Sequence, residues 1–548
     1  MLGQMMDMPL QVSSILRHAA RHFGDTEVVS RRVEGDLHRY TYARCEERAR
    51  QLASALAKAG IGTGDRVATL AWNGYRHLEL YYGVAGMGAV IHTINPRLHP
   101  EQIAWIINHA EDRIVAFDVT FLPLMEAVAA KCPGVTHWLA MADPERQPAS
   151  EKLPGLGNYE QFLATGETDW TWPRFDENSA CALCYTSGTT GNPKGALYSN
   201  RSTVLHAYAA ALPDAMGASA RDSILPVVPM FHVNAWGIPF AAPLTGAKLV
   251  LPGPSLDGKS LYELFEAEGV TFAAGVPTVW LGLLGHLQAN GLKFSTLNRT
   301  VIGGSACPPA MIKAFREQYG VDVIHAWGMT EMSPLGTLSR LQNKHLALAP
   351  EGQRKLLEKQ GHTIFGVDMK IVDDAGQELP WDGKTYGNLL VRGPWVIRSY
   401  FKAEDEDPLE YDENGDGWFP TGDVATIDAD GFMQITDRSK DVIKSGGEWI
   451  SSIDLENLAM SHPAVANAAV IGVAHPKWDE RPLLIVVRKP GSEASVAEIL
   501  SVYEGKVAKW WTPDDVQFVE SIPLGATGKI LKTRLREQFR DYRLPTAG

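Results

Sequence analysis

Residues 185–195 read YTSGTTGNPKG, and this stretch decides how the rest of the chain is interpreted. It follows ACALC, a short apolar run that is typical of a buried strand. Glycine lets backbone N–H groups turn toward an anion, and the hydroxyls and the lysine add further donors. The pattern therefore predicts a phosphate-binding loop directly after a strand. A surface turn is the alternative if the loop had no companions elsewhere in the chain.

The loop does not match the Walker pattern G-x-x-x-x-G-K-[ST]. Counted from Gly188, the second glycine of that pattern falls on Pro193, and the Ser or Thr that holds magnesium falls on Gly195. A more general phosphate cradle fits the residues better. Its candidate members are Thr186, Ser187, Gly188, Thr189, Thr190, Gly191 and Lys194.

Length and composition indicate a globular protein of more than one domain. The chain has 548 residues, a charged fraction of 21% and a formal charge of −13, which argues against nucleic acid as the main partner. The first residues lack a basic start followed by an apolar core, and no uninterrupted apolar run reaches the ~20 residues of a membrane span. We therefore expect no membrane span and a cytoplasmic location.

Five cysteines are too few and too scattered for a disulfide framework. Cys181 and Cys184 form a CxxC, but no second pair completes a zinc site. They lie in the apolar run before the glycine-rich loop, so we predict that both are buried and structural.

The order of helix and strand signals predicts an α/β fold. Helical spacing in 41–60 and 77–90 alternates with strand patterns such as 65–72, and the alternation continues to residues 321–327. Such alternation is typical of largely parallel sheets. From about 360 to 437, short strands separated by turns predict a β-rich subdomain of the N-terminal domain 1–437. Residues 438–441 are predicted as a hinge, and 442–548 as a small mobile α+β domain.

An acidic stretch contains an apparent calcium loop. Asp412, Asn414, Asp416 and Gly417 match D-x-[DN]-x-[DN]-G, but the twelfth position is an aspartate where a bidentate Glu is required, and Pro420 interrupts the loop. A solvated turn before a buried WFPTGD strand is the favoured interpretation.

Distant motifs give the glycine-rich loop a more specific meaning. YTSGTTGNPKG resembles the signature loop of the adenylate-forming superfamily, which comprises acyl-CoA synthetases, luciferases and peptide-synthetase adenylation domains. Further stretches resemble the superfamily's other motifs, in the same order. They are PMFHVNAWG (229–237), GGSACP (303–308), HAWGMTE (325–331), WFPTGD (418–423), DRSKDVIKSGGEWIS (437–451) and PLGATGK (523–529). Within the superfamily, the chain resembles bacterial medium- and long-chain fatty-acyl and 3-methylmercaptopropionate CoA ligases.

The resemblance implies a two-step reaction with ATP, Mg²⁺ and coenzyme A. A carboxylic acid is first activated as its adenylate, and the acyl group is then transferred to the thiol. Lys529 is implied as the residue that bridges the substrate carboxylate and the α-phosphate. Thr330 is implied as an α-phosphate contact, and Glu331 together with Thr186 as the magnesium site.

Nucleotide contacts are implied by the same motifs. Asp423 should accept from the ribose hydroxyls, Arg438 should add a ribose or phosphate contact, and Trp327 should lie against adenine. The remaining residues of the two nucleotide motifs are Gly303, Gly304, Ser305, His325, Ala326, Gly328 and Met329.

The resemblance also implies that the small domain presents its two faces in turn, with Lys440 as the hinge residue. After rotation, a loop would line the pantetheine tunnel through Ser445, Gly446, Gly447 and Glu448. His475, Lys477 and Trp478 are weaker candidates for coenzyme A contacts, since a solvated turn explains them equally well.

The acid site is implied to involve Trp236, Val276, Pro277, Gly304 and Met332, which are small or apolar. His232 either gates the route to the site or is a packed imidazole. Residues 233–235 supply no carboxylate to pair with an amino group, so we expect an apolar acid without an α-amino group. The resemblance to the CoA ligases named above implies a short or medium acid, for which methylthio-propionate and a fatty acid both qualify. A luciferase-like oxidase and an enzyme that loads a carrier protein are the alternatives. Relatives of this kind are often homodimers.

Overall fold

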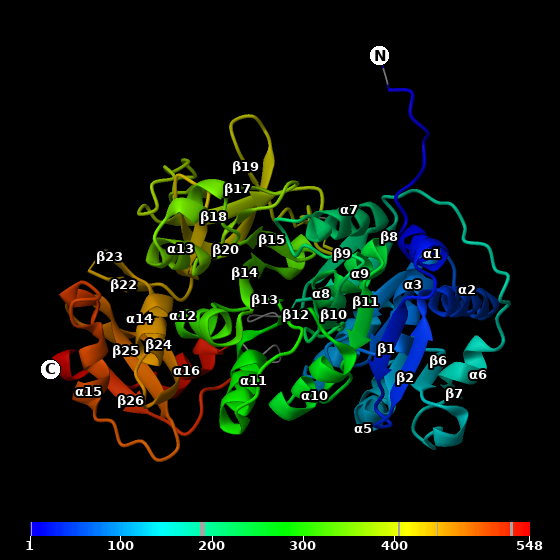
Figure 1. Cartoon of the computed structure of the whole chain (residues 1–548), viewed down its shortest axis with the longest axis horizontal. Coiled ribbons are helices and arrows are strands. Elements are labelled where there is room, and N and C mark those ends of the chain that lie inside the picture. Colours follow the sequence, from blue (N-terminus) through cyan, green and yellow to red (C-terminus); the bar gives the residue numbers. More distant parts are fainter. Residues whose placement is uncertain (2, 187–191, 404–405, 447, 526–529, 548) are drawn as a thin grey trace.

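The computed structural model describes residues 1, 3–186, 192–403, 406–446, 448–525 and 530–547. Two large sheets and their helices occupy one end of an elongated molecule, and the C-terminal residues form a separate unit at the other end (Figure 1). A five-stranded sheet lies between these two parts (Figure 1). Within the described part of the chain, no helix is long and apolar enough to cross a membrane.

The first large sheet has seven strands in the order β7-β6-β5-β3-β4-β8-β9. All neighbours are parallel except β8 and β9, which form an antiparallel pair around the glycine-rich loop. The strand predicted before that loop is therefore present. The strands are β3 (Arg66–Leu70), β4 (Val90–Thr93), β5 (Ile114–Asp118), β6 (His137–Met141), β7 (Leu156–Asn158), β8 (Ala180–Tyr185) and β9 (Gly195–Ser199).

The second large sheet has nine strands in the order β16-β15-β14-β13-β12-β10-β11-β1-β2. Its centre, from β11 to β14, is parallel. The strands are β1 (Glu27–Arg31), β2 (Leu37–Thr41), β10 (Ser223–Pro226), β11 (Lys248–Leu251), β12 (Phe272–Gly275), β13 (Arg299–Ile302), β14 (Asp322–Gly328), β15 (Leu335–Leu338) and β16 (His362–Thr363).

Helices lie between the two sheets and on their outer faces. The largest hydrophobic core combines residues of both sheets with those of the helices between them. The inner helices are α1 (Val12–His22), α2 (Tyr42–Lys58), α3 (Tyr75–Gly86), α7 (Asn200–Ala211) and α9 (Ile238–Thr245). Separate cores lie under α10 (Gly258–Glu268) and α11 (Pro277–Asn290), and under α4 (Pro100–Ala110) and α5 (Leu122–Val128). The predicted α/β fold is confirmed.

The β-rich segment forms its own antiparallel sheet from β17 (Asp368–Val372), β18 (Gly387–Arg392), β19 (Glu410–Tyr411), β20 (Gly417–Ile427) and β21 (Met433–Arg438). The apparent calcium loop is the turn between β19 and β20. Asp412 Oδ1 accepts from the backbone N–H groups of Asn414 and Asp416, and Oδ2 accepts from Trp418 Nε1. These bonds explain the aspartate as a turn-forming residue.

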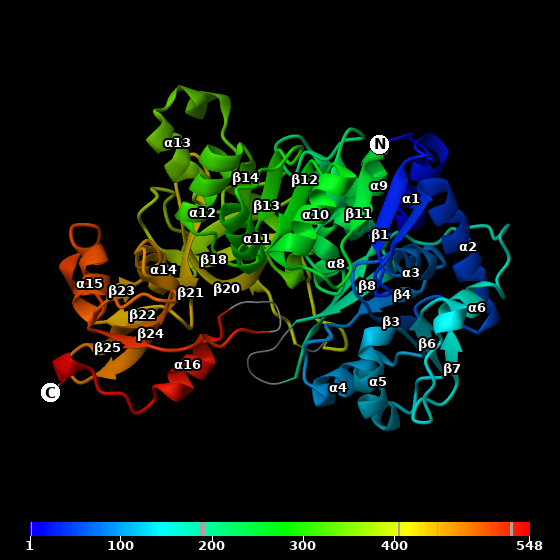
Figure 2. The same cartoon turned by 60° about the horizontal axis from the view of Figure 1, so that its bottom comes forward.

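The C-terminal unit is an α+β domain in which helices pack against one five-stranded sheet. Its sheet contains β22 (Ile443–Ser445), β23 (Glu448–Ile450), β24 (Val465–His475), β25 (Asp479–Arg488) and β26 (Asp515–Phe518). Helix α14 (Ser452–Met460) contributes to one core of this unit and α16 (Lys532–Gln538) to the other (Figure 2). The chain passes from the β-rich sheet to this unit between Arg438 and Ile443, the interval where we expect the hinge.

Candidate active site

Four adjacent parallel strands end at one edge of the nine-stranded sheet, and their following residues build the site. Strands β10, β12, β13 and β14 run in the same direction. The segments after them are residues 227–236, Val276, residues 303–305 and residues 329–332. Ligands of open α/β sheets bind at the carboxyl ends of strands. The topology therefore brings together three motifs that the sequence separates widely.

The phosphate loop is described at its two ends only. Ser187, Gly188, Thr189, Thr190 and Gly191 lie outside the described residues. Thr186 N donates to Lys194 O at 2.8 Å, which closes the base of the loop. The Lys194 ammonium is half exposed, 3.2 Å from Glu406 Oε2 and 5.0 Å from the centre of the Tyr400 ring.

Thr330 and Glu331 form a short 3-10 turn after β14, and both are buried. Tyr198 Oη donates to Thr330 O at 2.5 Å, and Tyr400 Oη donates to Glu331 Oε1 at 2.9 Å. Burial and the neighbouring Glu331 raise the pKa of Tyr400 above its usual value, so its hydroxyl keeps its proton. The Glu331 carboxylate is thus oriented by a permanent donor.

Asp423, Trp327 and Arg438 come together although they lie on three strands. Trp327 Nε1 donates to Asp423 Oδ2 at 2.9 Å, and Arg438 Nε lies 2.8 Å from Asp423 Oδ1. The Asp423 side chain is only 3% exposed. The indole packs over Gly336, where an added Cβ would lie 2.6 Å from the ring. Gly336 belongs to none of the motifs, so the sequence did not single it out.

His325 joins two of the motifs. Its Nδ1 donates to Glu358 O at 2.9 Å, and its Nε2 accepts from Cys307 N at 3.2 Å. Burial lowers the pKa of His325 to about 4, so the imidazole is neutral. The next residues of the strand approach other backbone closely: an added Cβ at Gly328 would lie 1.9 Å from Pro334 O, and Met329 N donates to that oxygen.

A mostly apolar cavity of about 60 Å³ lies beside the glycine pair of the 303–305 segment. Gly304 has a φ of +80°, and an added Cβ would lie 3.2 Å from Val276. At Gly303 the added atom would lie 2.8 Å from Ala326 O. The cavity is lined by Arg97, Val227, Val228, Pro229, Phe231, His232, Trp236, Leu256, Val276, Val279 and Gly304.

The structure thus brings four of the expected acid-site residues together: His232, Trp236, Val276 and Gly304. Pro277 begins helix α11 and Met332 packs near Gly336, and neither lines this cavity. Ser305 is exposed. Arg97 and Leu256 were not expected, since their segments carry no motif. Arg97 follows β4 and reaches the cavity through the packing of the two sheets, whereas Leu256 follows β11, the strand beside β10.

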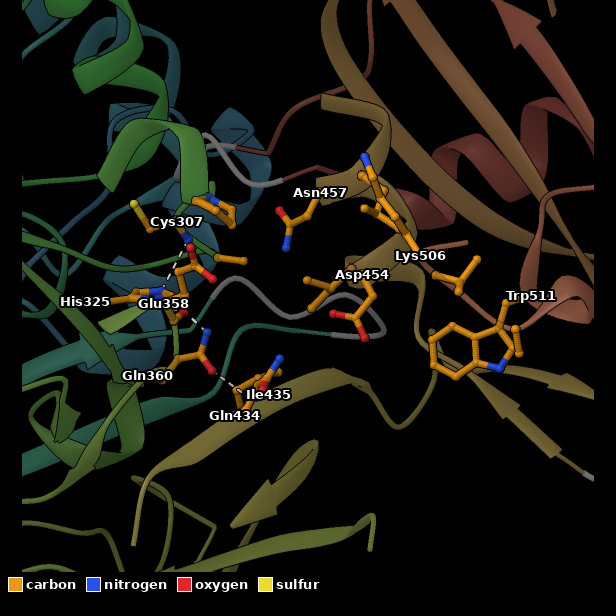
Figure 3. A pocket seen from close by; sticks show the side chains of 16 residues that line it. Cys307, His325, Glu358, Gln360, Gln434, Ile435, Asp454, Asn457, Lys506 and Trp511 are labelled. Carbon is orange, nitrogen blue, oxygen red and sulfur yellow. Dashed lines mark hydrogen bonds between the residues drawn. The ribbon is translucent and has the colours of Figure 1, made fainter. Parts of the chain in front are cut away.

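A larger cavity, of about 520 Å³, separates the small domain from the rest of the molecule. Figure 3 shows His325, Glu358 and Gln360 on one side, and Asp454, Asn457, Lys506 and Trp511 on the other. Gln360 Oε1 accepts from Ile435 N at 2.7 Å. Burial raises the pKa of Asp454 to about 6.

The residues expected near pantetheine form one corner of the small domain. Gly446 has a φ of +61° and its N–H donates to Trp478 O at 2.9 Å. Ser445 Oγ accepts from Arg481 Nη1, and Lys477 N donates to His475 Nδ1. The structure therefore brings the 445–446 segment and the 475–478 turn together. Lys440 is exposed, whereas Gly447, the Glu448 side chain and Lys529 lie outside the described residues.

Cys181 and Cys184 are buried thiols on β8. Burial raises their pKa values to about 12 and about 11, so neither is a thiolate at neutral pH. The predicted burial of both cysteines is confirmed.

Comparison with known proteins agrees with this geometry. The model of the AMP-binding enzyme family matches residues 16–401, and the model of its C-terminal domain matches residues 454–529. The chain belongs to the AMP-binding enzyme family. This confirms the resemblance to adenylate-forming enzymes that the motifs indicated.

Three relatives of this AMP-binding enzyme illustrate its range. It is 56% identical to a 3-methylmercaptopropionyl-CoA ligase of Ruegeria lacuscaerulensis over 99% of each chain. It is 54% identical to a medium-chain-fatty-acid–CoA ligase of Ectopseudomonas oleovorans over 99% of this chain and 98% of the relative. Among solved structures, an anthranilate CoA ligase in complex with anthranoyl-AMP superposes with a TM-score of 0.85 at 25% identity, covering 97% and 98% of the two chains.

Proposed function

We propose that this chain is an AMP-forming acid–CoA ligase whose acid is apolar and short or medium in length, with 3-methylmercaptopropionate as the first candidate. The family and the names of its relatives support ATP and coenzyme A as the other substrates. The cavity of about 60 Å³ carries the proposal for the acid. That volume has room for roughly four water-sized groups, which suits a short chain in the conformation observed.

The reaction has two steps, and the cations and hydrogen-bond donors of the chain are assigned to different groups of the substrates. A carboxylate oxygen attacks the α-phosphorus of ATP and pyrophosphate leaves; the coenzyme A thiolate then attacks the acyl carbon and AMP leaves. Bringing two anions to ~4 Å costs a few kcal/mol even at a surface-like dielectric. Lys529 is assigned to offset this repulsion between carboxylate and α-phosphate, with Thr330 as a hydroxyl donor, and the phosphate loop with Lys194 would hold the phosphates that leave.

Nucleotide binding is assigned to the Asp423 cluster. Trp327 and Arg438 each hold one carboxylate oxygen of Asp423, which fixes its orientation before a ribose arrives. A carboxylate accepts two hydrogen bonds from a vicinal diol. Trp327 is assigned to offer a face of its indole to adenine from the same position.

The residues present fit a magnesium ion. Mg²⁺ in such sites takes one or two protein oxygens and substrate phosphates. The Glu331 carboxylate is buried and held by Tyr400, and Thr186 stands at the start of the phosphate loop. When bound, the ion would neutralise charge on the phosphates.

Thioester formation is assigned to the other face of the small domain. Gly446, with its neighbours Ser445, Gly447 and Glu448, would meet pantetheine after rotation about Lys440. The positive φ of Gly446 and its contact with Trp478 support a close backbone approach there. A homodimer in the cytoplasm is part of the same proposal.

The test is a coupled assay of AMP release over unbranched acids of graded length and 3-methylmercaptopropionate, with and without coenzyme A. We expect sustained turnover only with coenzyme A, and the highest kcat/KM among short and medium acids. Highest activity with long acids would refute the proposed acid class. Turnover without coenzyme A that consumes oxygen would indicate an oxidase instead, and turnover only with an added carrier protein would indicate carrier loading.

A further inference from the structure

The wall of the acid cavity is held in place by side chains that do not touch the cavity. Val227, Val228 and Phe231 line it, and they follow β10 of the nine-stranded sheet. The side chains that anchor this segment come from the loop between β3 and α3 and from α3 itself, which belong to the other half of the N-terminal domain. We propose that Asn73 is a specificity-determining positioning residue that sets the shape of the acid cavity through the main chain of residues 226–230. This rests on the proposed acid–CoA ligase function.

Both the nitrogen and the oxygen of the Asn73 side-chain amide form hydrogen bonds with the main chain of this segment. Its Nδ2 donates to Pro226 O at 2.8 Å and to Val228 O at 2.9 Å, and its Oδ1 accepts from Met230 N at 2.6 Å. The residue is 4% exposed. Two carbonyls and one N–H as partners fix which way the amide points, since the reversed amide would place oxygen against oxygen. One side chain thereby determines the path of five consecutive residues.

A second anchor comes from α3. Tyr81 Oη donates to Met230 O at 2.5 Å and lies 3.1 Å from Asn234 Oδ1. Both Tyr81 and Asn234 are buried. The anchors therefore continue along the segment as far as the turn that carries Trp236.

That turn needs support from its surroundings. Residues Val233 to Trp236 all have positive φ values, between 45° and 58°. This is a left-handed backbone conformation that residues other than glycine rarely adopt. Such a backbone persists only when the surrounding structure over-determines it. Trp236 lines the cavity, so its position depends on the segment that Asn73 and Tyr81 hold.

The decisive variant is Asn73→Asp, which keeps the volume and the acceptor but replaces the donating NH₂ group by an oxygen facing two carbonyls. We expect the wall to shift, so that the ratio of kcat/KM between two acids differing by two carbons changes at least about fivefold, while the KM for ATP stays within about twofold. A merely structural role would lower activity toward all acids alike.

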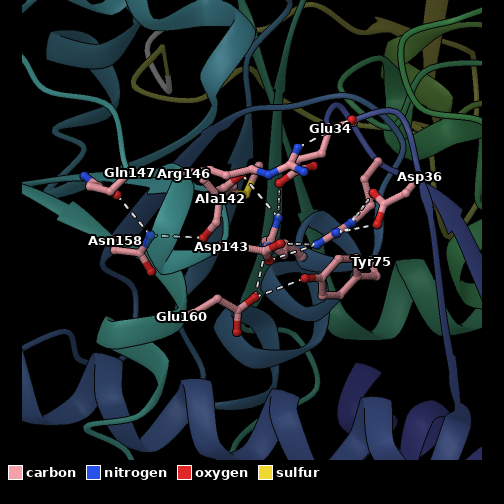
Figure 4. A network of polar contacts seen from close by, with 12 residues as sticks. Glu34, Asp36, Tyr75, Ala142, Asp143, Arg146, Gln147, Asn158 and Glu160 are labelled. Atoms are coloured by element: carbon pink, nitrogen blue, oxygen red, sulfur yellow. Dashed lines mark hydrogen bonds and ion pairs between the residues drawn. The ribbon is translucent and has the colours of Figure 1, made fainter.

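Asn158→Asp is the matched control. Asn158 is also buried, and its Nδ2 donates to Ala142 O and Gln147 Oε1 at 3.0 Å (Figure 4). Its Oδ1 accepts from Gln161 N. Asn158 ends β7 and its partners lie between β6 and β7 and on α6 (Tyr159–Leu163), and none of these residues lines the acid cavity. We expect this variant to lose comparable stability and keep the wild-type acid profile.

Tyr81→Phe tests the same wall if Asn73→Asp does not fold. Its control is Tyr42→Phe, which removes an equally buried hydroxyl that donates to Ala247 O at 2.7 Å. A changed acid profile in Tyr81→Phe but not in Tyr42→Phe supports the positioning role. An unchanged profile in the folded variants overturns it, whereas a wild-type enzyme that activates no simple acid would overturn the proposed function instead.

Discussion

The molecule contains two interfaces, called joints below, that differ in how closely their two sides are packed. Between the two large sheets, buried side chains such as Asn73 bond directly to main chain on the other side, within a continuous hydrophobic core. Between the large part and the small domain lies a cavity of about 520 Å³. Bonds beside the hinge connect the two parts there: Ser451 Oγ donates to Thr436 O at 2.5 Å, and Ser452 N donates to Asp437 Oδ2 at 2.8 Å.

The difference matches two different tasks. Close-packed interiors do not deform continuously, so the first joint suits a cavity whose shape must select an acid. A joint with an open cavity and with side-chain bonds beside the expected hinge, as the described residues have it, can separate without disturbing either core. We infer that the first joint determines which acid reacts, and the second determines which half-reaction takes place.

The largest expected effect comes from removing the lysine that the small domain is proposed to supply for the first step. Lys529→Ala should lower adenylate formation on the order of 10²–10³-fold, because a preorganised cation facing developing charge is lost. Thioester formation from supplied acyl-adenylate should be largely spared. Pyrophosphate exchange and single-turnover thioester assays measure the two steps separately. Equal loss in both would mean that the second joint does not separate the half-reactions.

A smaller and opposite effect is expected at Gly446. Gly446→Leu places a side chain on a residue with a φ of +61°, where its Cβ would lie 2.9 Å from the Trp478 ring. Displacing this corner should slow thioester formation about tenfold to a hundredfold and leave adenylate formation within about twofold, since misplacement by an ångström is costly only for the step that uses the corner.

Gly491→Leu separates backbone strain from the local contact. Gly491 has a φ of +78° in the same domain, but an added Cβ meets nothing within 4 Å. The control should cost similar stability and spare both half-reactions. If it slowed thioester formation as much as Gly446→Leu, the effect would come from general destabilisation of the small domain.

The sequence predicts the joint beside the expected hinge better than the joint between the two large sheets. Periodic helix and strand patterns are local, so α2, β3 and β8 were predictable, and the motifs were sufficient to expect Trp327, Asp423 and Arg438 at one place. Asn73 and Tyr81 belong to no motif, and their contacts depend on how two sheets pack against each other. Gly336 also belongs to no motif, and its contact with Trp327 depends on the pairing of β14 with β15. The roles of Ser187 and Lys529, which lie outside the described residues, stay predictions.

The smallest predicted effect concerns Ser451, whose hydroxyl bonds across the joint beside the expected hinge. Ser451 caps helix α14 by accepting from Asp454 N, and its hydroxyl also donates across the joint to Thr436 O. Ser451→Ala should therefore weaken the cap and the joint together. Ser495→Ala removes a similar cap from α15 (Val496–Leu500), where the hydroxyl bonds Glu498 within the small domain. A cap is worth about 1 kcal/mol, so both variants should lose similar stability.

Only Ser451→Ala should also loosen the joint. A loss of about 1 kcal/mol raises the separated population roughly fivefold, so trypsin should cleave at Arg438, Lys440 and Lys444 correspondingly faster. Limited proteolysis with mass spectrometry measures those rates against the Ser495→Ala control. Equal cleavage in both variants would mean that the bond to Thr436 does not restrain the small domain, and that the cavity between the domains, rather than the hinge contacts, governs how readily it separates.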